Sequence, residues 1–219
     1  MKRYDLIIFT FFLFLICLLS FPIVNAHLPL SGKVIYIDPG HGGVDPGSVV
    51  GEVYEKDINL AISQNLEKEL GKYGALVSLT RDGDYDLGSP KATYRKKSDF
   101  DQRIKKINQS KTDLYISIHL NVLANKKYYG PQVFYLKNDE KSKEIANQLQ
   151  KVLNEKLGSD REIKPIPSST YMYSKLKVPG VLVECGFLSN PAEKEKLITE
   201  SYQQEFASYL AYAIQSLNF

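Results

Sequence analysis

"KVIYIDPGHGG", residues 33–43, has the pattern of a buried strand that runs straight into a tight turn. Its first half is apolar, as in a strand inside a sheet. The glycines that follow allow a sharp turn and let other groups approach the backbone closely. The turn also holds His41, one of only three histidines in the chain, so a histidine at this place calls for an explanation.

The rest of the chain alternates between strand and helix patterns. Further strands are expected over 75–81, 113–121 and 130–136, with one or two more inside 168–187. Helices are expected over 55–74, 100–110, 140–158, 190–200 and 201–219, and a long polar loop over 82–97. This alternation predicts an α/β fold in a single domain, with helices on both faces of a central sheet.

The N-terminus differs in composition from the rest. A short basic start is followed by an uncharged apolar run, Leu6–Val24, which ends at the sequence "VNA". The ending fits a signal-peptidase site, while the length of the run approaches that of a membrane-spanning helix. We therefore predict that 1–26 is a signal peptide or a membrane anchor, 27–32 a linker and 33–219 the functional domain. Either form directs the domain across a membrane.

Charge and cysteine content exclude two classes of protein. A net charge of +3, with basic and acidic residues interspersed, does not indicate a nucleic-acid binder. The chain has two cysteines, and Cys17 lies in the apolar N-terminal run, so no disulfide framework is expected. Cys185 lies in an apolar strand pattern and is expected to be a small core residue.

Two histidines follow predicted strands at equivalent places. His41 comes after the first strand, and His119 closes the strand "DLYISIHLN". Ligands in open α/β sheets bind at the carboxyl ends of strands, so these imidazoles can converge on a metal. A catalytic zinc needs a third protein ligand and keeps one position open for water. Glu55, at the start of the first helix, is the leading candidate, with Asp45 and Asp57 as competitors; a helix N-terminal acid stabilised by the macrodipole is the alternative for Glu55.

Glu184 is a single carboxylate inside the apolar strand "PGVLVECGF". An ionised carboxylate is rarely buried unless it is paired or used in chemistry. Desolvation would raise its pKa towards the range of a general base. The alternative is a structural ion pair with Arg81 or Arg103. Asn121 and Arg103 are further candidates for substrate contact, and each also fits a structural role.

Four motifs in order resemble one enzyme family. "YIDPGHGGVDPG", "EKD", "YISIHLN" and "VLVECGFLSNPAE" are similar to the zinc-dependent N-acetylmuramoyl-L-alanine amidases of the amidase_3 type, from about Lys33 to the C-terminus. The resemblance implies a mixed, mostly parallel sheet and one zinc ion. It also implies that His41, Glu55 and His119 are the metal ligands and that Glu184 is the catalytic glutamate, in hydrolysis of the amide between N-acetylmuramic acid and L-alanine of peptidoglycan.

Further stretches resemble the spore-cortex, germination-specific branch of that family (CwlD-like). They include "GALVSLTR" and "YRKKSDFDQRIKKIN". That branch takes part in forming muramic-δ-lactam by removing stem peptides, which would place the protein outside the cytoplasmic membrane, in the forespore intermembrane space. Cys185 departs from the valine or threonine expected beside the catalytic glutamate. An activating partner protein is a further expectation.

Two other functions fit parts of the sequence. A zinc-dependent sugar deacetylase would show an aspartate-rich metal motif with two histidines one helical turn apart, and no such pair is present. A non-catalytic cell-wall binding protein would tolerate the loss of Glu184 or of a ligand, whereas all four residues are present.

Overall fold

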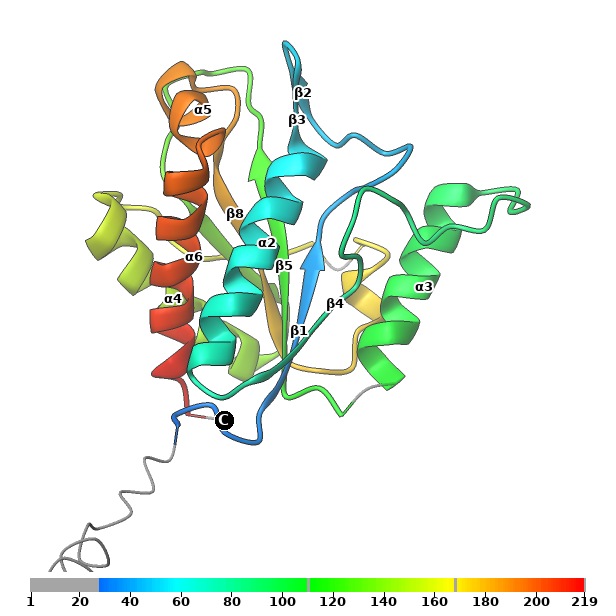
Figure 1. Ribbon diagram of the computed structural model, residues 1–219, viewed down its shortest axis with the longest axis horizontal. Coiled ribbons are helices and arrows are strands. Elements are labelled where there is room, and N and C mark those ends of the chain that lie inside the picture. Colours follow the sequence, from blue (N-terminus) through cyan, green and yellow to red (C-terminus); the bar gives the residue numbers. More distant parts are fainter. Residues whose placement is uncertain (1–27, 110, 168, 219) are drawn as a thin grey trace, which may run out of the picture.

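The computed structural model describes residues 28–109, 111–167 and 169–218, which form a sheet with helices packed on it (Figure 1). The six strands of the sheet lie in the order β4-β1-β5-β8-β6-β7. Their bounds are β1 Val34–Pro39, β4 Leu76–Leu79, β5 Leu114–Asn121, β6 Gln132–Leu136, β7 Lys164–Ile166 and β8 Gly180–Phe187. Neighbouring strands are parallel except β6 and β8, which are antiparallel, so the sheet is mixed and mostly parallel as predicted.

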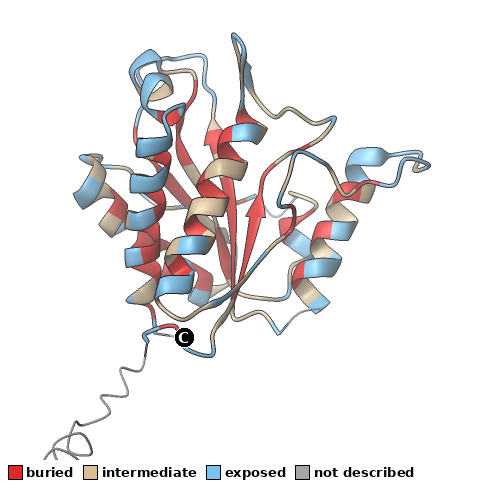
Figure 2. Ribbon diagram, viewed as in Figure 1, coloured by how far each residue is buried: buried red, intermediate tan, exposed pale blue. Residues whose placement is uncertain are grey.

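The helices cover the sheet unequally. Their bounds are α2 Glu55–Lys72, α3 Arg95–Gln109, α4 Glu140–Leu157, α5 Pro191–Leu197 and α6 Glu200–Gln215. One face of the sheet carries the main core, to which α2, α4 and α6 contribute their buried apolar residues (Figure 2). The other face has a smaller core with Ile107 of α3 and Met172 and Tyr173 from the segment that contains the 3₁₀-helix η1, Tyr173–Lys175.

Alternation along the strands divides polar from apolar side chains. In β5, Ile116 and Ile118 lie in the main core, so Ser117 and His119 point to the opposite face. In β8, Val183 and Cys185 lie in the main core, which turns Glu184 to that same opposite face. The face covered by α3 therefore collects the polar groups at the carboxyl ends of the strands.

Three short strands were not predicted, and one helix is longer than predicted. The hairpin of β2 (Val49–Val50) and β3 (Val53–Tyr54) has two residues per strand, and β7 has three, so none offers a periodic pattern. Helix α3 begins at Arg95, inside the predicted loop. The prediction missed this first part of the helix because two of its buried residues, Asp99 and Arg103, are charged, and a search for apolar spacing overlooks them.

The predicted N-terminal signal or anchor, 1–26, lies outside the described residues, as do Cys17 and the third histidine, His27. Of the predicted linker, 28–32 is described, and in it Leu30 is fully buried in the main core and donates its N–H to Tyr73 O at 2.9 Å. Within the described ranges, none of the helices combines the length and the apolar character required to cross a membrane. Cys185 is fully buried, which confirms its predicted place in the core.

Candidate metal centre and catalytic groove

The turn after β1 presents His41 to the end of the sheet. His41 has φ of 62°, a left-handed conformation uncommon outside glycine. Two buried arginines bind the turn: Arg103 donates from Nη1 to Pro39 O (2.8 Å) and from Nη2 to His41 O (2.6 Å). Arg81 donates from Nη2 to Gly40 O at 2.9 Å. These bonds hold the carbonyl groups of the turn towards the arginines and so fix the backbone that carries the imidazole.

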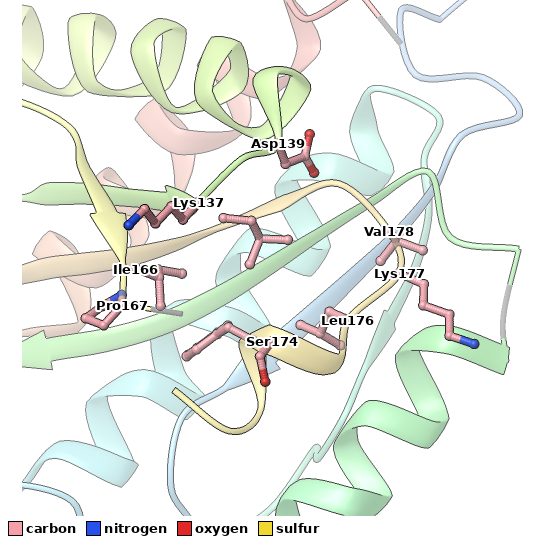
Figure 3. A pocket seen from close by; sticks show the side chains of 10 residues that line it. Lys137, Asp139, Ile166, Pro167, Ser174, Leu176, Lys177 and Val178 are labelled. Atoms are coloured by element: carbon pink, nitrogen blue, oxygen red, sulfur yellow. The ribbon is translucent and has the colours of Figure 1, made fainter. Parts of the chain in front are cut away.

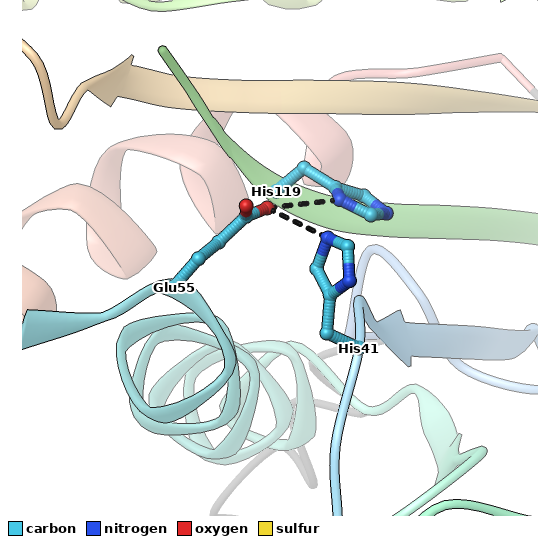
Figure 4. A group of neighbouring side chains, drawn as sticks. All are labelled: His41, Glu55 and His119. Atoms are coloured by element: carbon cyan, nitrogen blue, oxygen red, sulfur yellow. Dashed lines mark hydrogen bonds and ion pairs between the residues drawn. The ribbon is translucent and has the colours of Figure 1, made fainter. Parts of the chain in front are cut away.

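Glu55 is the first residue of α2 and is only 2% exposed. The β2–β3 hairpin brings the chain back to the sheet, and the Ser48 N–H donates to Glu55 Oε2 at 2.8 Å. Oε1 of Glu55 lies 3.2 Å from His41 Nε2 and 3.1 Å from His119 Nδ1 (Figure 4). The Leu120 N–H also donates to this oxygen, at 3.1 Å. A long loop thus closes so that one carboxylate faces both histidines.

These three side chains could hold a metal ion. One ligand atom from each of His41, Glu55 and His119 lies within 4.8 Å of the others. Two ligands of a tetrahedral zinc ion, each about 2.0–2.1 Å from the metal, lie about 3.3 Å apart. The measured separations of 3.1 Å and 3.2 Å are close to this value, and two nitrogens with one carboxylate oxygen are a donor set that suits zinc.

The pKa values of Glu55 and His41 reflect how close the three side chains lie. Burial by itself would raise the pKa of Glu55, but hydrogen bonds from His119 and His41 hold that pKa far below its ordinary value. Burial lowers the pKa of His41, and the opposing bond to Glu55 outweighs it, so the pKa is raised. In the metal-free protein, this raised pKa favours the cationic form of His41 beside the Glu55 carboxylate.

The two alternative candidates for the third ligand, Asp45 and Asp57, lie in other positions. Asp57 is exposed on α2. Oδ2 of Asp45 lies 3.0 Å from His41 Nδ1, the ring nitrogen that faces away from Glu55. A carboxylate on the outer nitrogen of a metal-binding histidine fixes the tautomer and orientation of the ring. Asp45 is thus placed to orient His41, a role that the sequence analysis missed although it had singled out the residue.

Glu184 lies beside His119, its register neighbour on the adjacent strand. Its Oε2 atom is buried and has no hydrogen-bond partner. Burial raises the pKa of Glu184 to about 7. The ion pair considered as an alternative does not form, because Arg81 binds backbone carbonyls and Arg103 binds Asp38 and Asp99. The carboxyl group is therefore not engaged in an ion pair, and it lines the same cavities as His41 and His119.

The two proposed substrate contacts differ in their surroundings. Asn121 lines an open cavity of about 420 Å³ next to His119 and Glu184. Arg103 lines a second cavity, of about 310 Å³, but is only 2% exposed, and its guanidinium is bound to Asp38, Asp99 and the β1 turn. These bonds fit the structural role that the sequence analysis left open for Arg103.

Figure 3 shows a third cavity, of about 350 Å³, which shares Tyr173 with the second cavity. Its lining includes Leu136 at the end of β6, which runs antiparallel to β8 and so ends away from Glu184. It contains none of the histidines or glutamates described above. The chemistry therefore belongs to the two cavities around His41 and His119, which together we call the catalytic groove.

Comparison with known proteins identifies the family. Residues 35–216 match the N-acetylmuramoyl-L-alanine amidase family Amidase_3. The chain belongs to this family. The amidase is 43% identical over 185 residues to the germination-specific N-acetylmuramoyl-L-alanine amidase of Bacillus subtilis, across 83% of this chain and 78% of that protein. The family, enzyme class and fold inferred from the sequence motifs are confirmed.

Solved structures agree with this assignment. The CwlD amidase from Clostridioides difficile, solved in complex with the GerS lipoprotein, matches the amidase with a TM-score of 0.79 and 38% identity, over 84% of this chain and 96% of that one. An N-acetylmuramoyl-L-alanine amidase from Clostridium difficile 630 matches with a TM-score of 0.74 and 29% identity, over 84% and 95% of the two chains.

Proposed function

We propose that this amidase is a zinc enzyme in which His41, Glu55 and His119 hold the metal and Glu184 is the general base. The convergence of the three candidate ligand atoms beside a carboxyl group with one buried, unpaired oxygen is the observation that carries the proposal. Bound zinc would supply a Lewis acid and an activated water.

Side chains of the protein transfer the protons and hold the metal ligands in position. Glu184 takes a proton from the attacking water and delivers it to the nitrogen of the leaving L-alanine. Asp45 accepts a hydrogen bond from His41 Nδ1 and so keeps the proton on that nitrogen. The other ring nitrogen, Nε2, which faces Glu55, is then available to the metal. Arg103 and Arg81 hold the turn that carries His41. The substrate amide lies across the open part of the groove near Asn121.

We further propose that the enzyme removes stem peptides from spore-cortex peptidoglycan, as a step in muramic-δ-lactam formation. Support comes from the 43% identity to a germination-specific amidase. The N-terminal apolar run would export the domain as a signal peptide or anchor it, with 27–32 as the linker. The GerS complex of the C. difficile amidase supports a partner protein for this enzyme as well.

Zinc content measured after purification tests the ligand assignment. The variants His41→Ala and His119→Ala should each lose most of the one zinc per chain that the wild type binds, because two ligands hold zinc far more weakly than three. Asp57→Asn is the matched control, since this exposed competitor should leave the zinc content unchanged. Full stoichiometry in either histidine variant would contradict the assignment.

A further inference from the structure

One exposed lysine joins the two cavities of the catalytic groove. Both cavities are lined by His41, His119, Glu184, Asp45 and Lys96. Among the described residues, the lysines and arginines that line either cavity are Lys96 and Arg103. Arg103 is buried and bound to two aspartates, whereas the Lys96 side chain is 61% exposed. Lys96 is thus the cationic group that a ligand in the groove can reach.

Lys96 is held close to the metal centre. Its Nζ lies 3.0 Å from Asp45 Oδ2, the atom that also lies 3.0 Å from His41 Nδ1. The ammonium group is therefore two hydrogen bonds away from the imidazole. The Lys96–Asp45 pair is partly exposed, and such pairs hold their geometry weakly, so an incoming anion can share or take the ammonium group.

The helix dipole and the charges of the first turn of α3 do not favour a lysine at position 96. The first turn of α3 holds Arg95, Lys96 and Lys97 and contains no acidic residue. The positive end of the helix dipole disfavours cations in the first turn. Lys96 Nζ lies 5.8 Å from the centroid of the Phe100 ring, a weak contact at an exposed site. Replacement of Lys96 by a neutral residue should therefore change the stability of α3 only slightly, which makes such a variant a suitable probe of function.

We infer that Lys96 determines substrate specificity by binding a free carboxylate of the stem peptide, on the leaving-group side of the scissile amide. This inference rests on the proposed catalytic groove. The D-glutamate that follows L-alanine in peptidoglycan is linked through its side chain, which leaves its α-carboxylate free. In an extended peptide this residue lies within about 7 Å of the scissile bond. Lys96, two hydrogen bonds from His41, is placed to meet it.

A different role for Lys96 would be to balance the charge of Asp45 and so support His41. The two roles predict different results with two substrates. Loss of substrate recognition affects only a substrate with the free carboxylate. Loss of support for Asp45 and His41 weakens zinc binding and affects all substrates equally.

The experiment compares kcat/KM for two soluble muramoyl peptides, one with a free α-carboxylate on the second residue and one with that group amidated. Lys96→Gln should lower kcat/KM about threefold to tenfold for the free acid, mainly through KM, and leave the amidated substrate and the zinc affinity unchanged. Lys96→Arg should restore most of the preference for the free acid over the amidated substrate. Lys105→Gln, the same charge change on an exposed position about 13 Å further along α3, is the matched control.

Equal losses on both substrates, a weaker zinc affinity, or no change in the preference would each overturn the inference. A wild-type enzyme that binds zinc but cleaves neither substrate would contradict the proposed function itself, and the inference with it.

Discussion

At the scale of the residue, the Glu184 carboxyl group lies in surroundings that differ strongly from water. It lies in β8 between the fully buried Val183 and Cys185, and its Oε2 accepts no hydrogen bond. Burial raises its pKa to about 7 from the ordinary 4.5. The unfolded chain releases this proton near pH 4.5 and the folded chain only near pH 7, so Glu184 makes the free energy of unfolding fall as pH rises through this window.

Glu184→Gln should therefore stabilise the metal-free protein at high pH. At about 1.4 kcal/mol per pKa unit, the gain in unfolding free energy at pH 8 is on the order of 3 kcal/mol, and it should vanish near pH 4, where both forms are neutral. Urea unfolding in the presence of a chelator, across pH 4 to 8, measures it. The exposed Glu195→Gln is the control and should show no such pH-dependent gain. A pH-independent difference for Glu184→Gln would mean that its carboxyl group is not desolvated.

Single residues were predictable where the local pattern was unusual. His41 and His119 stood out because each follows a strand, and Glu184 because it interrupts an apolar run. Glu55 could not be chosen from the residues alone, because its closeness to both histidines depends on the fold of the loop between the turn and α2. The sequence carries no local signal for that long-range closure, so the prediction of Glu55 as a ligand came from the family motifs.

At the scale of elements, the end of β1 and the end of β5 fit together through a glycine. A Cβ atom at Gly40 would overlap the imidazole of His119, and the Gly40 N–H donates to Ile118 O at 2.9 Å. Gly40 does not have a positive φ, so close approach of the ring, rather than backbone strain, requires glycine here. The turn and the strand can bring their histidines together only with this packing.

Gly40→Ala should therefore displace His119 and weaken zinc binding. We expect a loss of about 1–3 kcal/mol in unfolding free energy and a zinc dissociation constant about 10- to 100-fold higher. Zinc titration against a competing chelator and urea unfolding measure the two effects. In the control, Gly71→Ala, the Cβ enters open space in α2, which should leave zinc affinity unchanged and stabilise the helix slightly. Unaltered zinc affinity in Gly40→Ala would show that the fit is loose.

Long elements with regular spacing were predictable and short ones were not. Strands β1, β5 and β6 and helices α2, α4 and α6 lie where the sequence predicted them. Strands β2 and β3 pair only with each other in a short hairpin, and β7 is held by its pairing with β6, so none of the three has a periodic pattern of its own. The early start of α3 was missed because the helix buries an Asp99–Arg103 pair that serves the β1 turn.

At the scale of the whole molecule, the two faces of the sheet differ in composition and in role. The apolar core under α2, α4 and α6 stabilises the sheet. The opposite face, under α3, contains a buried polar network in which Asp38 accepts from Arg103, Thr80 and Ser117. The groove lies at the carboxyl edge of this polar face, where the parallel strands β1, β5 and β8 end together. The fold thus places the three candidate metal ligands, His41, Glu55 and His119, beside an open groove.

The most direct test is mass spectrometry of peptidoglycan after digestion by the zinc-loaded wild type and by zinc-loaded Glu184→Gln. The wild type should release stem peptides that begin with L-alanine and leave peptide-free muramic acid. Glu184→Gln should retain its zinc and lose at least about 100-fold in rate, since a general base contributes that much or more. Cleavage at any other bond, or a Glu184→Gln variant as fast as the wild type, would contradict the assignment of Glu184 as the base of a zinc amidase.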